Sequence, residues 1–156
     1  MEGRSITEWI EIFGKMPRQI RLYPGISPAM TAEYTEVYGI TVPDDYLEFM
    51  SLTNGADFLN SRVSIWKIPL SLDEKIPDWK SIEYFNRPDM RKKIPFSENC
   101  LLIAGNDLGD YVAITGEKPG FPYKYISPDM NDCWYYSDLS SWLEEIWKEW
   151  ILGETE

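Results

Sequence analysis

Hydrophobic residues recur at helical spacing in four segments of the chain, one near each end and two between residues 27 and 55. The first helix is predicted over residues 6–15, because Ser5 and Glu8 can form a capping box and Pro17 ends the helical pattern. One face of this helix carries Ile6, Trp9, Ile10 and Phe13. We expect that face to pack into the core.

Two further helices are predicted next, over residues 28–38 and 44–52. The first begins with a serine N-cap and a proline, and it ends before Gly39, which suits a left-handed cap. Its inner face is predicted to consist of Met30, Tyr34, Val37 and Tyr38. The second begins after Pro43 and is closed by the Asn-Gly pair at 54–55, and its apolar face consists of Tyr46, Leu47, Phe49, Met50 and Leu52.

The centre of the chain has the patterns of strands. Residues 62–68 alternate in part, and Trp66 falls outside the alternation, so we expect its ring to be exposed and available to a partner. Residues 69–99 contain four prolines and many charges, and they predict only a short helix over 79–85. Further strands are predicted over 101–105, 111–114, 123–126 and 133–136, and the turn at 106–110 joins the first two into a hairpin.

The clearest helix is the last one, in which apolar residues recur from Leu139 to Ile151 and Gly153 follows the end. Ser137 or Asp138 can cap it. Its tryptophans, at 142, 147 and 150, are expected in the core. Runs of helices followed by strands, with no βαβ alternation, predict a single α+β domain over residues 1–156 with helices on one side of an antiparallel sheet.

The charge of the chain changes the range of possible partners. The formal net charge is −11, and residues 101–156 hold eleven acidic residues against three basic ones. An anionic protein is repelled by phosphates, so direct binding to nucleic acid or to an anionic membrane is not expected, whereas a basic protein would be attracted. The N-terminus has no secretory pattern and no apolar run reaches membrane-spanning length, so we expect a cytoplasmic protein.

The chain contains no histidine, which removes nucleophile activation by a Ser-His-Asp or Cys-His arrangement and any histidine-containing metal site. Cys100 and Cys133 are too few for a four-cysteine site and are expected to be buried rather than bridged. The loop 105–110 resembles a calcium loop only in composition, because its spacing is that of a turn between strands. We therefore expect no metal, no cofactor and no catalytic site; a reaction carried by paired carboxylates is the enzymatic alternative.

Three motifs, in order, resemble the SUKH superfamily, which includes fungal cell-wall-synthesis regulators of the Smi–Knr type and many bacterial immunity proteins. The first is Val42-Pro-Asp-Asp-Tyr-Leu-Glu-Phe-Met50 followed by Thr53-Asn-Gly-Ala56, preceded by the helix that starts at Ser27. The second runs from Leu102 through the Leu-Gly-Asp turn to Ile114, and the third is Ser137-Asp-Leu-Ser-Ser-Trp-Leu143. Val42 stands where the family usually has leucine, and residues 69–99 align with no family motif.

The resemblance implies an α+β fold with a twisted antiparallel sheet and flanking helices, with a family core over residues 27–152 behind an N-terminal helix and linker over 1–22. It also implies no catalysis. The bacterial members act mainly by binding and neutralising toxin domains, many of them nucleases. The fungal members suggest instead a regulatory scaffold or a module that binds a small ligand.

The leading hypothesis is therefore a cytoplasmic immunity protein that binds a basic toxin domain. A nuclease is one such domain, because it must be basic to hold phosphates, and an acidic inhibitor is attracted to that surface. Acidic side chains on loops between strands can be presented to such a partner. The residues predicted to contact it are Asp107, Asp110, Asp129, Asp132 and Trp66. A deep pocket lined by tryptophan and tyrosine would favour the ligand-binding alternative, and a flat acidic face would favour the toxin.

Overall fold

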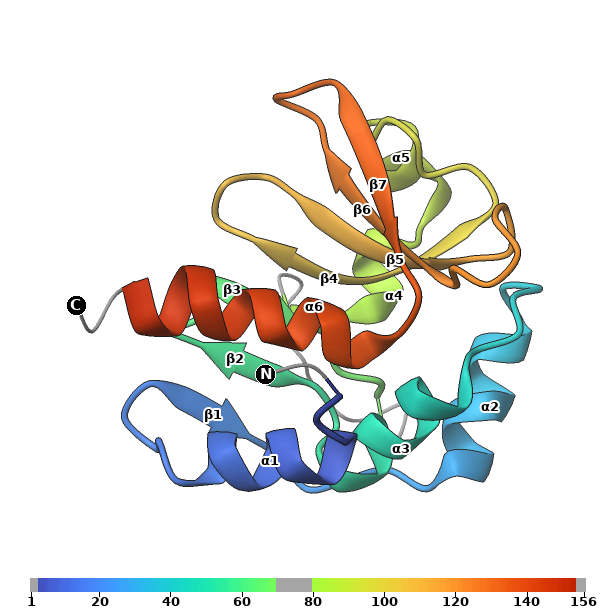
Figure 1. Ribbon diagram of the computed structural model, residues 1–156. Coiled ribbons are helices and arrows are strands. Elements are labelled where there is room, and N and C mark those ends of the chain that lie inside the picture. Colours follow the sequence, from blue (N-terminus) through green and yellow to red (C-terminus); the bar gives the residue numbers. More distant parts are fainter. Residues whose placement is uncertain (1–2, 70–79, 154–156) are drawn as a thin grey trace.

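The computed structural model describes residues 3–69 and 80–153, and these form one α+β domain around a twisted seven-stranded antiparallel sheet (Figure 1). The strands pair in sequence order, so the sheet is an uninterrupted meander of β1 (Ile20–Leu22), β2 (Ala56–Phe58), β3 (Val63–Ile65), β4 (Cys100–Asn106), β5 (Tyr111–Thr115), β6 (Tyr123–Ser127) and β7 (Asp132–Tyr136). The helices are α1 (Ile6–Gly14), α2 (Pro28–Glu36), α3 (Asp44–Leu52), α4 (Ile82–Phe85), α5 (Pro88–Arg91) and α6 (Leu139–Glu145), which continues into the π-helical segment η2 (Ile146–Leu152). The predicted fold class is confirmed.

The four strands predicted after residue 100 are confirmed, and β4 and β5 form the expected hairpin. The strand predicted over 62–68 is shorter and covers only β3. Strands β1 and β2 were not predicted, because three residues each are too few to show an alternation. The predicted helix over 79–85 is the single turn α4; its first residue, Trp79, lies outside the described residues.

Helix α1 begins and ends as its sequence predicts. The Ser5 hydroxyl accepts from the backbone N–H of Glu8, and the Glu8 carboxylate accepts from the backbone N–H of Ser5, which completes the capping box. The Phe13 ring meets Phe58 of β2 edge to face, with 5.2 Å between the centroids. The apolar stripe of α1 thus fixes this helix against the start of the sheet.

The face of α2 that packs inward agrees only in part with the predicted one. Met30 and Val37 are exposed, at 44% and 79% of their surface, and the buried residues of the helix are Thr31 and Thr35. The Thr35 hydroxyl donates to the backbone carbonyl of Thr31 at 2.9 Å, so it needs no partner outside the helix. Tyr34 and Tyr38 of the predicted face are half-buried and pack against the core, so the prediction is confirmed for these two and wrong for Met30 and Val37. The fully buried threonines give no apolar signal in the sequence.

Helices cover both faces of the sheet, which corrects the prediction that they lie on one side (Figure 1). Phe58 faces α1, and the Tyr123 hydroxyl donates to Asp45 of α3, so both point to the first face. Trp66, on the opposite side of the chain from Ile65, stacks on Phe85 of α4 instead. The segment between β3 and β4, in which only the short helix over 79–85 was predicted, covers this second face.

The last helix follows its prediction up to Glu145 and then widens. Asp138 is the cap, with its carboxylate accepting from the backbone N–H of Ser141 at 2.8 Å. The next seven residues form η2, in which Trp147 packs against Trp9 of α1 with 6.2 Å between ring centroids. Widened turns of this kind are rare and are often found at functional sites.

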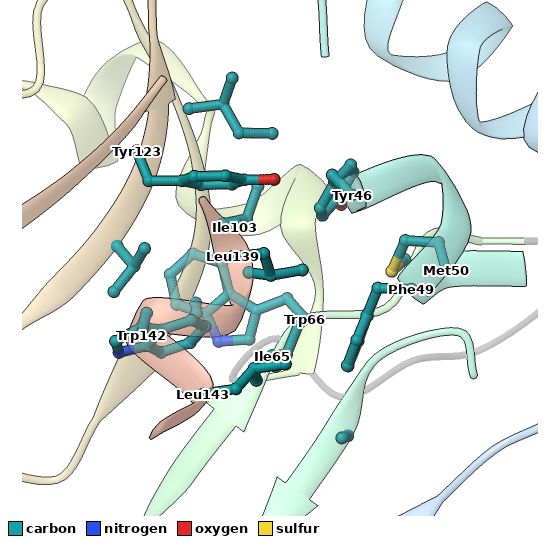
Figure 2. Packing of buried hydrophobic residues seen from close by; sticks show 14 of the residues in the cluster. Tyr46, Phe49, Met50, Ile65, Trp66, Ile103, Tyr123, Leu139, Trp142 and Leu143 are labelled. Carbon is teal, nitrogen blue, oxygen red and sulfur yellow. The ribbon is translucent and has the colours of Figure 1, made fainter. Parts of the chain in front are cut away.

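The core lies between the first face of the sheet and the helices α1, α3 and α6 (Figure 2). Figure 2 shows Trp142 and Leu143 of α6 close to Ile65 of β3, with Phe49 and Met50 of α3 beyond them. All five of these side chains are buried. These side chains join α3 and α6 to the sheet.

Two buried asparagines bond to the chain where regular pairing stops. The Asn54 side chain donates to the carbonyl of Ile68 at 2.8 Å and accepts from its N–H at 2.9 Å. Asn86 binds Leu102 in the same two-way manner, with both distances 2.8 Å. Asn54 was predicted only to stop α3, but its amide also satisfies backbone groups that would otherwise be buried without a partner.

The two cysteines are free thiols, and only Cys100 is fully buried; Cys133 is half-buried. Burial raises the pKa of Cys100 to about 11. The thiol therefore stays protonated at neutral pH, as suits a packing residue rather than a nucleophile. It lies beside the Lys124–Glu117 pair, with its sulfur 3.3 Å from the Glu117 carboxylate.

The Lys124–Glu117 pair makes the stability of the fold depend on pH. Lys124 is buried on β6 and donates to Glu117 at 3.0 Å and to the carbonyl of Phe96 at 2.7 Å. Burial alone would raise the pKa of Glu117, but the hydrogen bonds it accepts and the charge of Lys124 outweigh burial and hold this pKa below its usual value. Burial likewise opposes the charge on Lys124, yet the bond to Glu117 leaves its pKa raised.

We expect Glu117→Gln to lower the free energy of unfolding at pH 7 by about 1.5–3 kcal/mol, the range for a hydrogen bond to a charged group. The stabilisation by Glu117 is present above its unfolded pKa of about 4.3 and disappears as pH falls through the lower pKa of the folded state. The wild type and the variant should therefore converge in urea titrations below about pH 4. A difference between them that stays constant from pH 7 to pH 3 would contradict this assignment.

Candidate functional site

Three turns of the meander meet at one end of the sheet. Because every neighbouring pair of strands is antiparallel, the turns β2–β3, β4–β5 and β6–β7 all lie at the same end. The C-terminal end of η2 reaches this end too, since Trp150 and Gly153 line one groove together with Arg62 and Leu108 of two of these turns. The candidate site is built here.

The groove lies between the first face of strands β4–β7 and the helix α6–η2, and its volume is about 500 Å³. We call it the aromatic groove. It is lined by Arg62, Val63, Gly105, Asn106, Leu108, Asp110, Tyr111, Val112, Tyr125, Trp134, Trp142, Glu145, Ile146, Glu149, Trp150 and Gly153. Such a volume falls in the range of about 300–1,000 Å³ that is usual for ligand pockets.

The floor of the groove is a stacked pair of rings. Tyr125 of β6 and Trp134 of β7 are direct partners in the strand register, and their rings lie 4.6 Å apart and 12° from parallel. The Trp134 indole N–H donates to the Tyr136 hydroxyl at 3.2 Å, which fixes the ring. Both Tyr125 and Trp134 are half-buried, so part of each ring faces the groove.

Three carboxylates line the groove: Asp110 on the β4–β5 turn, Glu145 at the end of α6 and Glu149 on η2. The Asp110 carboxylate accepts from the Tyr125 hydroxyl at 2.7 Å, and Glu145 accepts from the hydroxyl of Tyr136. Burial, and then the hydrogen bond to Asp110, raises the pKa of Tyr125. Burial and the bond to Glu145 raise the pKa of Tyr136 in the same way. Both phenols therefore remain neutral donors across the physiological range.

Asn106 gives the β4–β5 turn its shape. Its side-chain oxygen accepts from the backbone N–H groups of Leu108 and Asp110, at 3.0 and 3.1 Å. Gly109 supplies the left-handed residue of the turn, with φ +84°. The Asn106 amide also donates to the Tyr125 hydroxyl at 3.1 Å. The family-like Gly-Asp turn is thus tied to the floor of the groove.

The other end of the groove holds a guanidinium of the chain itself. Arg62 pairs with Asp107 at 3.2 Å, and its Cζ lies 5.2 Å from the centroid of the Trp150 ring. The turn that carries Arg62 is unusual, because three consecutive residues with side chains have left-handed φ values: Leu59, Asn60 and Ser61, at 53°, 57° and 69°. Such conformations cost energy and cluster at binding and catalytic sites.

The prediction that Trp66 is exposed is wrong. Only 2% of its surface is exposed, and its ring stacks on Phe85 with 3.9 Å between centroids and 6° between planes. Trp66 breaks the apolar alternation because the second face of the sheet is also covered, by α4. It is a core residue and cannot anchor a partner.

The four predicted aspartates lie at the same end of the sheet but not in one cluster. Asp110 lines the groove, and Asp107 lies outside it in the ion pair with Arg62. Asp129 is exposed on the β6–β7 turn, and Asp132 is the exposed first residue of β7 rather than a loop residue. The part of the chain that the structure describes contains no group of three residues able to hold a metal ion, and the side chains of the 105–110 loop bind different partners.

Sequence reasoning missed most of the groove. It singled out neither Glu145 nor Glu149, and it placed Trp150 in the core with Trp142 and Trp147. In the structure Trp142 is buried, Trp147 packs on α1, and Trp150 is half-buried on the wall of the groove. One usable signal was the alternation in β6 and β7, which puts aromatic residues at 123, 125, 134 and 136 on one face.

Comparison with protein-family models gives one match: the SMI1 / KNR4 family (SUKH-1), over residues 25–149. This match includes the Val-Pro-Asp-Asp-Tyr motif, the Gly-Asp turn and nearly all of the groove. Comparison with curated proteins found no match. Among the described residues, no helix is long and apolar enough to span a membrane.

Proposed function

The chain belongs to the SMI1/KNR4 family (SUKH-1), and on this premise we propose that it is a non-catalytic immunity protein that binds and neutralises a basic toxin domain in the cytoplasm. The family includes immunity proteins, and its members are generally non-catalytic immunity or regulatory proteins. The family match is the observation that carries the proposal. It confirms the resemblance on which the prediction from sequence was based.

The distribution of charge supports a basic partner. The chain carries a net charge of −11, and carboxylates at the turn end of the sheet are exposed on the β6–β7 turn and in the aromatic groove. A toxin that acts on nucleic acid must present a basic surface to phosphates, and an acidic inhibitor can cover that same surface. Long-range attraction would speed the association by about 10- to 1,000-fold at low salt. Neutralisation would then require only that the toxin be covered, with no reaction.

The aromatic groove favours a second candidate, a regulatory module that binds a small ligand. A half-open volume of about 500 Å³ with a stacked Tyr125–Trp134 floor is the feature expected for it. The two candidates differ in what fills the groove. A protein partner would cover the groove and the β6–β7 turn together, whereas a small ligand would leave Asp129 and Asp132 untouched.

The test is co-expression of the full chain with the toxin-like product of the gene next to its own. We expect co-purification, rescue of growth, and an association rate that falls at least about tenfold between 50 and 500 mM salt. Replacing both Asp129 and Asp132 with asparagine should slow association, since exposed charges act mainly on the on-rate. The matched control replaces Glu33 and Glu36, exposed acids of α2, with glutamine. No complex and no rescue would contradict the proposal, and an association rate indifferent to salt would contradict its electrostatic part.

A further inference from the structure

We propose that the aromatic groove is the part of the docking surface that recognises an arginine side chain of the partner protein. This inference rests on the proposed function and names the chemistry of its contact. The expected occupant is a guanidinium presented by a protein, to which the groove offers a buried carboxylate, an exposed carboxylate and aromatic rings.

The first observation is the state of Asp110. This residue is 9% exposed and lines the groove, and the partner of its side chain within the described residues is the neutral Tyr125 hydroxyl, bound at Oδ2. No described residue donates to Oδ1. Oδ1 therefore stays open to solvent in the groove, where a cation that reaches it can form a charge-assisted hydrogen bond.

The second observation is the helix wall opposite. Glu149 is exposed on η2, lines the groove and forms no hydrogen bond or ion pair with any residue between 3–69 and 80–153. Glu145, one turn earlier, is bound by the Tyr136 hydroxyl. The groove therefore has negative charge on both sides. Arg62 is the basic residue that lines it, and Arg62 forms an ion pair with Asp107, which lies outside the groove.

The third observation is that the groove already accommodates this chemistry. The Arg62 guanidinium lies over the Trp150 ring, 5.2 Å from its centroid. Stacking on an aromatic face is a preferred environment for arginine. Tyr125 and Trp134 offer further half-buried aromatic surface in the same groove.

Arginine fits the groove better than lysine or a neutral ligand. Its guanidinium is planar, stacks on aromatic rings and can donate to two carboxylates from one plane, whereas the lysine ammonium is a strongly hydrated point charge. A neutral aromatic ligand would fill the volume but would leave Asp110 without a cation. The order of affinity expected is therefore arginine, then lysine, with an uncharged isostere far weaker.

The experiment titrates the full chain, labelled with nitrogen-15, with the pentapeptide Gly-Gly-Arg-Gly-Gly, blocked at both ends. Two matched peptides carry lysine or citrulline in place of arginine, and citrulline keeps the shape but not the charge. We expect the arginine peptide to shift the indole signals of Trp134 and Trp150, with affinity at least about tenfold above that of the citrulline peptide. Equal shifts from all three peptides, or shifts that avoid the groove, would overturn the inference.

Three variants assign the effect to residues. Asp110→Asn keeps one oxygen to accept from Tyr125 and replaces the charged second oxygen with an NH2 group, which repels a guanidinium donor. Glu149→Gln changes an exposed residue that forms no hydrogen bond or ion pair with the described residues. Each should lower the affinity for the arginine peptide by about threefold to tenfold or more. Glu36→Gln makes the same charge change on α2, outside the groove, and should leave binding unchanged. An unchanged affinity in both groove variants would refute the proposal.

The same variants separate this inference from the proposed function. If wild-type protein neutralises the toxin and Asp110→Asn with Glu149→Gln neutralises it equally well, the groove is not the arginine contact, but the immunity function stands. If wild-type protein forms no complex with the toxin while the arginine peptide still binds the groove, the immunity function fails and the groove chemistry remains. If the groove variants lose both toxin binding and peptide binding, while the wild type and Glu36→Gln keep both, the result supports the immunity function and the arginine contact.

Discussion

Replacing Trp66 with alanine is expected to lower the free energy of unfolding by about 3–5 kcal/mol, the range for deleting a large buried aromatic side chain. The Trp66 ring fills the space between β3 and α4, where it stacks on Phe85 and meets the edge of Tyr111 at 6.2 Å. Gly105 lies directly beneath it, and a Cβ there would come within 2.9 Å of the ring. Urea titration followed by circular dichroism measures the loss.

Trp134→Ala is the matched control, because Trp134 is half-buried on the floor of the groove. It should cost less than about 2 kcal/mol, since less apolar surface leaves the protein interior. It should also weaken binding of the arginine peptide, which Trp66→Ala in the folded state should not. The opposite pattern, a stable Trp66→Ala protein that has lost only its partner, would restore the exposed role that the sequence suggested for Trp66.

The elements that the sequence predicts well are those whose signals are local. The last helix has an aspartate cap and a wide apolar stripe, and the β4–β5 hairpin has an apolar run followed by an Asn-to-Asp turn. Each of these signals lies within about a dozen neighbouring residues, and the structure confirms them. The capping box of α1 is confirmed for the same reason.

The wrong prediction for Trp66 and the missed groove have the same cause. In both cases the residues that determine the structure lie far apart in the sequence. Trp66 is buried because Phe85, nineteen residues later, folds back over it. The groove joins Arg62, Asp110, Trp134 and Glu149 from four separate elements, so no sequence window contains it. Alternation could place the aromatic residues of β6 and β7 on one face, but it could not show that α6 leaves that face partly open.

The family motif at 42–46 contains a residue, Asp45, whose long-range contacts cannot be predicted from its local sequence. Asp44 and Asp45 follow Pro43 in the first turn of α3, where negative charge is favourable. That explanation suffices for Asp44, which is exposed. Asp45 does more, because its carboxylate accepts from the Tyr123 hydroxyl of β6 at 2.5 Å and from the backbone N–H of Leu139 at 2.7 Å. One side chain thus joins α3, the sheet and the start of α6.

Asp45→Ala is therefore expected to lower the free energy of unfolding by about 2–5 kcal/mol, because two donors lose their acceptor and each costs about 1–3 kcal/mol when left unpaired. Tyr123 is fully buried, and burial together with Asp45 raises its pKa, so the phenol stays protonated and can only lose the bond, not ionise. Thermal and urea unfolding should both report the loss. Fraying of α6 at Leu139 should appear as faster amide hydrogen exchange there.

Asp44→Ala is the control, since it removes the same charge from the same helix turn and should change stability by no more than about 0.5–1 kcal/mol. Tyr123→Phe removes one of the two bonds to Asp45 and keeps the packing, at a cost of about 1 kcal/mol. If Asp45 acts through Tyr123, the double variant should lose less than the two single losses combined, by about 0.5 kcal/mol or more. Strict additivity, or equal losses at Asp44 and Asp45, would mean that the motif acts only on its own helix and does not join α3 to the sheet and to α6.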